Sequence, residues 1–318
     1  MTKRITSLVL ALVLLCAALA VLTSCDFSTR PTTWTGKYKY DNAKKYTAGA
    51  ASFGVDTVRS LDIDWGAGVV LVEHDENVTE VTLREYVYTG KTEETPVAVA
   101  ENEQLYYWHD GNTLRVRYLQ SKLGRREVHA KYLYVLLPPE KTLDAVCIKT
   151  DTGTAEISGI TATRAELSGV SGNVAASDAT VEELKLASVS GEVSAYGTFG
   201  KASLHTTSGK VYACTNETFS ASRLTIGSVS GEVLVDMRAN VLPGETEIET
   251  VSGNVKFQFS YETSYVIDFR SKGSGTYTSQ FGDEETQVGE RYTVGTDGGH
   301  IAVTTTSGKV SVTRVIER

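Results

Sequence analysis

The phrase Ser188-Val-Ser-Gly-Glu-Val193 decides the fold, because near-copies of it return along the chain. Four further copies are clear: Thr206-Thr-Ser-Gly-Lys-Val211, Ser228-Val-Ser-Gly-Glu-Val233, Thr250-Val-Ser-Gly-Asn-Val255 and Thr305-Thr-Ser-Gly-Lys-Val310. Weaker copies centre on Gly153 and Gly172, and the glycines of the first six copies are 18 to 22 residues apart. A regular period of this length is typical of stacked structural repeats.

Apolar residues alternate on both sides of each Ser-Gly pair. Four residues before the Ser, every copy has an aliphatic residue: Ile148, Leu167, Leu186, Leu204, Ile226, Ile248 and Val303. Three and five residues after it the side chains are again apolar, as in Val193 and Ala195. A period of two describes strands with one buried face, so the Ser-Gly pair is a tight corner between two strands. The sequence therefore predicts an all-β, single-stranded β-solenoid of the β-helix type, with coils of about 18–22 residues stacked ~4.8 Å apart.

The corner residues have two expected roles. Gly is required there either because the corner needs a positive φ or because the backbone of the neighbouring coil approaches closely. A Ser or Thr two residues before the corner Ser, such as Ser188 or Thr206, points inward. We expect its hydroxyl group to bond to its neighbours in the column or to the corner backbone.

The repeat is less regular at its two ends. Residues 61–72 fit the template if Ala67 takes the Ser position, so we expect the solenoid to open there. Residues 78–144 then form a strand-rich insertion or a set of irregular first coils, with a hairpin at Asp110-Gly111-Asn112. At Ser274-Gly275 the apolar residues are displaced by one position, which indicates either a bulge or a misaligned coil. The final coil is expected to cap the stack, since an open end would promote aggregation.

The N-terminal residues predict export and lipidation. Lys3 and Arg4 precede an uninterrupted apolar run over residues 8–22, which is typical of a signal peptide and is short for a membrane-spanning helix. The segment Leu22-Thr23-Ser24-Cys25 resembles the bacterial lipobox, which implies that Cys25 is the lipid attachment residue. We therefore expect a lipid-anchored protein on the extracytoplasmic side of a bacterial cell membrane.

The expected organisation has three parts. Residues 1–24 are the lipoprotein signal peptide, and residues 25–45 are the lipidated Cys with a polar, flexible tether. Residues 46–318 are the solenoid, with the irregular part over 78–144 and regular coils over 145–318.

Composition and spacing narrow the possible partners. The formal net charge is −8 and there is no basic stripe, which excludes nucleic acid as an expected partner. The five His residues are scattered and no pair has metal-ligand spacing, so we expect no metal and no cofactor. The outward-facing acids Glu166, Glu192, Glu232 and Glu249 fall in different columns, so we expect no catalytic pair of carboxyl groups.

Three features together resemble a bacterial family. They are Leu61-Asp-Ile-Asp-Trp-Gly-Ala-Gly68, Tyr132-Leu-Tyr-Val-Leu-Leu-Pro138 and the repeated Val-Ser-Gly-[Glu/Asn/Lys]-Val. The family is that of the adhesin-type domains of bacterial surface proteins, a β-strand-repeat domain of unknown function. The resemblance covers about residues 46–318 and implies a β-helix-like solenoid outside the cytoplasm, with no catalytic residues. Some relatives are connected to envelope-stress signalling.

We expect a surface lipoprotein that presents a non-catalytic β-solenoid for adhesion or for binding a cell-envelope partner, either a glycan or a protein. Two alternatives remain open: a glycan-active β-helix enzyme, and an envelope-stress sensing module that acts through a protein partner. The aromatic residues gathered in 86–134 either fill the core of a strand-rich cap or stack on a ligand. They are Tyr86, Tyr88, Tyr106, Tyr107, Trp108, Tyr118, Tyr132 and Tyr134.

Overall fold

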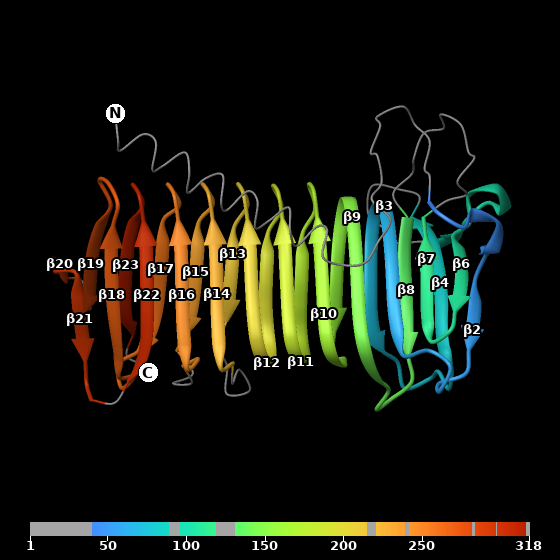
Figure 1. Ribbon diagram of the computed structural model, residues 1–318, viewed down its shortest axis with the longest axis horizontal. Helices are drawn as coiled ribbons and strands as arrows, with labels where there is room; N and C mark the ends of the chain where they lie inside the picture. Colours follow the sequence, from blue (N-terminus) through green and yellow to red (C-terminus); the bar gives the residue numbers. More distant parts are fainter. Residues whose placement is uncertain are drawn as a thin grey trace.

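The computed structural model describes residues 40–88, 96–118, 131–214, 221–238, 242–281, 284–296 and 298–315. The predicted signal peptide, the predicted lipidation site Cys25 and most of the predicted tether lie outside these residues. The described chain is an elongated stack of strands (Figure 1) with two short 3-10 turns, η1 (Ala43–Lys45) and η2 (Glu101–Glu103). In this part of the chain, no helix is long and apolar enough to cross a membrane.

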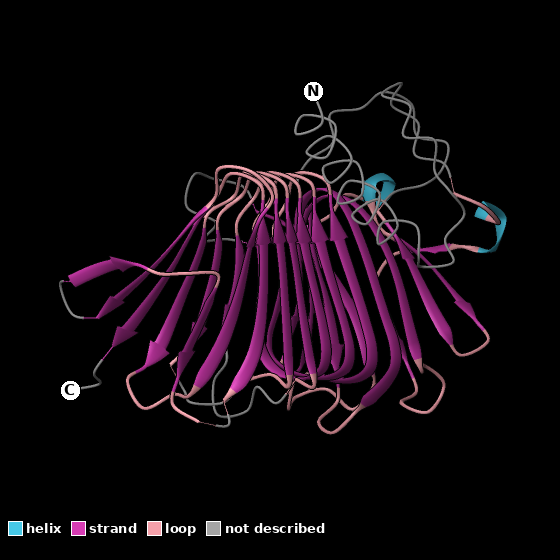
Figure 2. Ribbon diagram, turned by 60° about the vertical axis from the view of Figure 1, so that its left-hand side comes forward, coloured by secondary structure: helices cyan, strands magenta, loops and turns pink. Residues whose placement is uncertain are grey.

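The chain winds as an all-β solenoid, which confirms the predicted fold class. Each coil contributes two strands. The strand before the Ser-Gly corner belongs to what we call the upstream row, and the strand after the corner belongs to what we call the downstream row. Neighbouring coils pair in parallel and in register; for example, Leu186 pairs with Leu204 and Val193 with Val211. The corners are superimposed along one side of the stack (Figure 2).

The strands take the following places in space. The upstream row runs β6 (Tyr106–Asp110), β7 (Thr113–Arg117), β3 (Ser60–His74), β9 (Thr142–Ser158), β10 (Thr161–Gly169), β11 (Val174–Ser188), β12 (Val193–Thr206), β14 (Arg223–Ser228), β16 (Glu245–Thr250), β22 (Gly299–Thr305), β18 (Tyr265–Ser271) and β21 (Arg291–Val294). The downstream row runs β4 (Val81–Tyr88), β8 (Lys131–Leu137), then the other halves of β3, β9, β11 and β12, then β13 (Val211–Cys214), β15 (Val233–Met237), β17 (Val255–Ser260), β23 (Lys309–Val315), β19 (Thr276–Phe281) and β20 (Glu284–Gln287). Three short strands lie at the N-terminal edge: β1 (Thr47–Ala48), β2 (Ala51–Phe53) and β5 (Pro96–Ala98).

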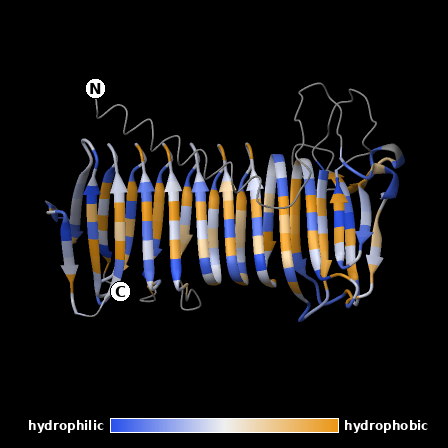
Figure 3. Ribbon diagram, viewed as in Figure 1, coloured by the Kyte–Doolittle hydropathy of each residue, from blue (hydrophilic) through white to orange (hydrophobic). Residues whose placement is uncertain are grey.

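The core is a set of aliphatic columns between the two rows. The residues predicted to lie four positions before each corner Ser form one such column and are all fully buried: Ile148, Leu167, Leu186, Leu204, Ile226, Ile248 and Val303. Hydropathy alternates along the strands, as expected when one side faces the core and the other faces solvent (Figure 3). Burial of these columns is the main source of stability for a stack of this kind.

The corner glycines are explained by close approach. A Cβ built on Gly209 would lie 1.8 Å from the carbonyl oxygen of Gly191, and one on Gly231 would lie 1.5 Å from that of Gly209. Neither glycine has a φ in the left-handed region, so of the two expected reasons the contact between coils is the one that applies here. The inward hydroxyl groups bond as predicted: Gly209 N–H donates to Thr206 Oγ1 at 2.9 Å.

At the C-terminal end, the spatial order of the coils differs from the chain order. The last coil, β22 and β23, lies between β16/β17 and β18/β19 and pairs in parallel with both (Figure 1). The expectation that the final coil caps the stack is therefore wrong. The cap is made by β21 and β20, which pair antiparallel with β18 and β19. These two strands carry the chain across the end of the stack, so the last coil can enter beside β16/β17.

The N-terminal end repeats this arrangement. The register predicted for residues 61–72 is confirmed, because Gly68 pairs with Gly153 and Ile63 with Ile148. Its predicted place at the opening of the stack is wrong, since β7 and β8 form a further coil outside β3. That outer coil is covered by β6 and β4, both antiparallel.

Two local predictions are confirmed. The hairpin at residues 110–112 joins β6 to β7, with Asp110 paired to Thr113 and Gly111 at a φ of 62°. The predicted irregularity at Ser274-Gly275 is one extra residue in the corner. Ser271 pairs with Thr305, and Thr276 pairs with Lys309. Four residues therefore lie between Ser271 and Thr276 in the β18/β19 coil, whereas three lie between Thr305 and Lys309 in the β22/β23 coil.

Candidate functional site

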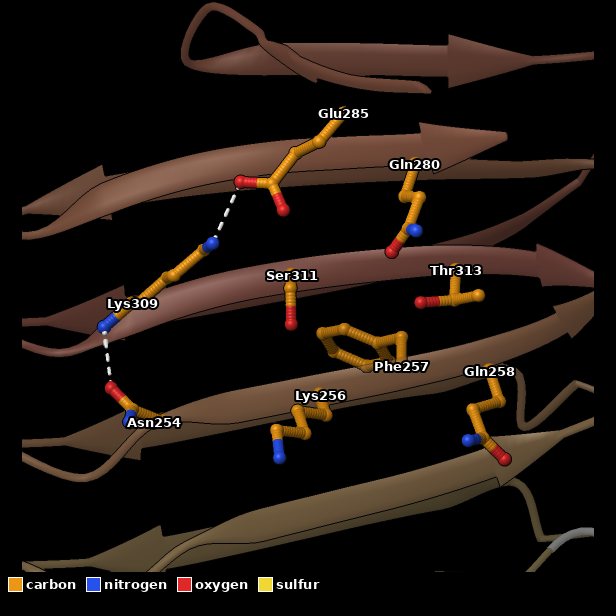
Figure 4. A pocket seen from close by; sticks show the side chains of 9 residues that line it. All are labelled: Asn254, Lys256, Phe257, Gln258, Gln280, Glu285, Lys309, Ser311 and Thr313. Atoms are coloured by element: carbon orange, nitrogen blue, oxygen red, sulfur yellow. Dashed lines mark hydrogen bonds and ion pairs between the residues drawn. The ribbon is translucent and has the colours of Figure 1, made fainter. Parts of the chain in front are cut away.

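A polar groove lies on the outer side of the downstream row, over β17, β23 and β19 (Figure 4). Its cavity has a volume of about 230 Å³. The floor is formed by the short side chains of Ser311 and Thr313 on the central strand β23. The longer side chains of Lys256 and Gln258 on β17 and of Gln280 on β19 flank this floor.

The groove is a consequence of where the last coil is placed. Thr313 pairs with Gln258 on one side and with Gln280 on the other, so two amides face each other across a hydroxyl group. The residue in the register of Ser311 is Lys256 on β17, Leu234 on β15 and Tyr212 on β13. Outward positions are therefore filled by bulky side chains in these three coils and by a small one on β23, which lowers the surface along that strand.

The charged groups at the groove are paired. Lys309 Nζ lies 2.7 Å from Glu285 Oε1, and this pair closes one end of the groove (Figure 4). The hydrogen bond from Lys309 holds the pKa of Glu285 below its ordinary value, so that carboxyl group stays ionised at neutral pH. Lys256 forms an ion pair with Glu232 of the preceding coil. In the lining that the structure describes, Asn254 Oδ1 also accepts a hydrogen bond from Lys309 N–H at 2.9 Å.

The chemistry of this lining suits binding better than bond cleavage. Glycoside hydrolysis by the usual route needs two carboxyl groups on either side of the scissile bond, one of them protonated. The described lining holds one carboxylate, Glu285, and its pKa is lowered rather than raised. Apart from the paired ammonium groups of Lys256 and Lys309, the remaining polar side chains of the lining carry amides and hydroxyls, which donate and accept hydrogen bonds without transferring protons at neutral pH.

The acids singled out from the sequence are not gathered into a site. The expectation that the four acids fall in different columns is wrong for Glu192 and Glu232, which belong to one outward column with Lys210 between them. Glu166 lies on β10 and Glu249 on β16, in the upstream row. Among the residues that the structure describes, no group of three or more His, Cys, Asp or Glu side chains could hold a metal ion.

Among the aromatic residues of 86–134, Tyr118 fills the core, whereas Tyr86 and Tyr134 are only partly buried. Tyr118 is buried, and its ring packs edge-on against Trp65 with the centroids 5.0 Å apart. Tyr86 and Tyr134 are half-buried neighbours on β4 and β8, with centroids 6.0 Å apart. These rings are carried by the cap and the first coils at the N-terminal end, and these elements lie at the opposite end of the stack from β17, β23 and β19 (Figure 1).

Sequence reasoning missed the groove because it depends on which strands are neighbours in space. Ser311, Thr313 and Gln280 come from coils that the repeat does not mark as out of order. The only available signal was the pair of small outward residues on β23, which contrasts with Lys256 and Gln258 two coils earlier in the chain. The predicted lipid attachment residue Cys25 lies outside the described residues, so the structure does not place it relative to the groove.

Comparison with known proteins gives a family and two similar structures. The family model described as Toastrack DUF4097 matches residues 80–313, more than half of the chain. A putative adhesin from Bacteroides fragilis NCTC 9343 is 14% identical, with 86% of this chain and 98% of that chain covered and a TM-score of 0.47. A putative cell adhesion protein from Clostridium sporogenes ATCC 15579 is 12% identical, with 85% and 100% covered and a TM-score of 0.25. No curated protein matches this chain.

Proposed function

This chain belongs to the Toastrack DUF4097 family, and on that premise we propose that it is a surface lipoprotein that binds a cell-envelope or external partner without catalysing a reaction. The protein is anchored through Cys25 on the extracytoplasmic side of a bacterial membrane. The tether separates the solenoid from the lipid surface, and the outer side of the solenoid is the binding surface.

The observation that carries this proposal is the outer groove on β17, β23 and β19. Its floor is a strand paired on both sides, so the lining residues are held at fixed spacing without any ligand. A site that is rigid before binding loses little conformational entropy on binding. Its charges are paired and its single described carboxylate is ionised, which supports recognition and argues against acid–base chemistry.

Replacing the predicted lipid attachment residue tests the anchor. In cells that express the full chain, Cys25→Ala removes the thiol that receives the lipid, so we expect the protein to move from the membrane fraction to the soluble or secreted fraction. Cys16→Ala is the matched control, because that Cys lies within the predicted signal peptide. Membrane fractionation followed by immunoblotting measures the distribution, and an unchanged membrane fraction for Cys25→Ala would overturn the anchor.

Co-sedimentation tests the binding role. The full chain, purified in detergent, is mixed with insoluble cell-wall sacculi and centrifuged. We expect the protein to pellet in a saturable manner, whereas it stays in the supernatant without sacculi. Absence of saturable binding to sacculi and to intact cells alike would contradict a binding role.

A further inference from the structure

We propose that the groove over β17, β23 and β19 binds a neutral oligosaccharide that lies along β23. This inference rests on the proposed binding role and specifies the class of ligand. It is carried by the charge balance of the groove, by the hydrogen-bonding groups on its floor and by the pairing of its central strand on both edges.

The charge pattern of the groove favours a neutral ligand. Both Lys side chains that line the groove have a carboxylate partner, Lys309 with Glu285 and Lys256 with Glu232. An anionic ligand would have to compete with these partners, and a cationic ligand would meet the paired ammonium groups. A neutral ligand makes neither demand, so the charge pattern favours it.

The floor of the groove and its edge offer amide and hydroxyl groups to a ligand. Gln258, Ser311 and Thr313 make no side-chain hydrogen bonds within the part of the chain that the structure describes, and all three are partly exposed. Each of these groups can both donate and accept. Sugar hydroxyl groups have the same dual capacity, so a saccharide can satisfy the row without an unpaired partner on either side. Ser311 and Thr313 lie two residues apart on one strand, ~6.6 Å, which gives regular contact points along the groove.

The backbone of β23 has no free edge for a bound peptide strand. A peptide that bound by extending a sheet would need a strand with a free edge. The central strand β23 is paired with β17 on one side and with β19 on the other, so its backbone groups are engaged. Recognition in this groove must therefore go through side chains, which again suits a ligand whose polar groups are hydroxyls.

Isothermal titration calorimetry of the full chain in detergent tests the proposal. The probes are the neutral hexasaccharides chitohexaose and cellohexaose, with hexagalacturonate and a neutral hexapeptide as comparison ligands. We expect at least one neutral hexasaccharide to bind at least tenfold more tightly than both comparison ligands. The two neutral probes distinguish a requirement for N-acetyl groups from recognition of hydroxyl groups alone.

Two variants locate the site. Ser311→Trp fills the floor and is expected to weaken binding at least tenfold. Ser194→Trp is the matched control, because Ser194 has the equivalent outward position on β12, in the register of Tyr212; it is expected to bind as the unchanged protein does. Thermal melting of both variants establishes that they are folded.

The outcomes separate the two proposals. Failure of both neutral hexasaccharides to bind, equal binding of the charged or peptide ligand, or full binding by a folded Ser311→Trp variant would each overturn the glycan groove. If Ser311→Trp still co-sediments with cell-wall sacculi, the groove proposal is wrong and the binding role stands. If the unchanged protein binds neither sacculi nor any probe, both proposals fail.

Discussion

At the scale of the residue, the corner glycines fix how closely the coils can stack. The carbonyl oxygen of Gly191 occupies the space that a Cβ of Gly209 would need, at 1.8 Å, and backbone cannot move aside as a flexible side chain can. Gly209→Ala must therefore separate or tilt two coils. We expect the free energy of unfolding to fall by roughly 1–3 kcal/mol, as for overpacked interiors, with a lower Tm by circular dichroism.

The matched control for this prediction is Gly289→Ala. No heavy atom lies within 4 Å of a Cβ built on Gly289, and its φ is not in the left-handed region. We expect its Tm to be unchanged or slightly higher, because Ala restricts the unfolded chain. Equal melting of Gly209→Ala and the unchanged protein would mean that the coils do not approach as the structure has them.

At the scale of the element, the N-terminal cap is joined to the solenoid by a buried ion pair. Lys131 opens β8 at an inward position, and its side chain is 2% exposed. Its Nζ lies 3.0 Å from Glu85 Oε2 on β4 and donates to the carbonyl oxygens of Glu103 and Tyr118 at 2.7 and 2.6 Å. All three ammonium protons are satisfied, so one side chain on β8 connects β4, η2 and the residue that follows β7.

Removing one partner of this pair is expected to be costly. Lys131→Met leaves the Glu85 carboxylate buried without a counter-charge, which typically lowers the free energy of unfolding by about 3–5 kcal/mol. The double variant Glu85→Gln with Lys131→Met removes both charges and is expected to recover most of that loss. Urea denaturation of the three proteins measures the coupling, and additive losses in the double variant would contradict it.

The same pair gives a pH dependence. Burial already raises the pKa of Glu85, and loss of Lys131 raises it further because the attraction of the ammonium is gone. A carboxyl group whose pKa is higher in the folded state favours folding when protonated, so its penalty grows as pH rises through the range between the unfolded and folded values. We expect Lys131→Met to be closest to the unchanged protein near pH 4–5 and furthest from it at pH 8. A loss of stability that did not change with pH would attribute the effect to packing alone.

At the scale of the whole molecule, each end of the stack contains a coil that is out of chain order. Because β22 and β23 pair with coils on both sides, a chain that ends at residue 298 loses contacts on two coils rather than one. Hydrogen exchange of this truncated protein is expected to show lost protection in β16 and β17 as well as in β18 and β19. Lost protection confined to β18 and β19 would mean that the last coil was the outermost one.

The sequence determines the register of this fold but not its coil order. Ser, Gly and the alternating apolar residues mark each corner, so the pairing of Leu186 with Leu204 follows directly from the repeat. The same repeat makes the coils nearly interchangeable as neighbours, because each one presents a similar apolar column and a paired backbone. The insertion of β22 and β23, and the groove that it forms with Ser311 and Thr313, therefore depend on how β20 and β21 carry the chain across the end. That path is a property of the whole fold and has no local signature.

The internal position of β3 has a mechanical consequence. This strand is hydrogen-bonded along its length to β9 on one side and to β7 and β8 on the other. Force applied to the N-terminal end of the chain first meets β1 and β2, which are two and three residues long and peel one bond at a time. It then meets a strand whose bonds, when pulled along its axis, must break together on two sides. When the molecule is pulled by its N-terminal end, we therefore expect β1 and β2 to detach at low force and the pairing of β3 to resist the force.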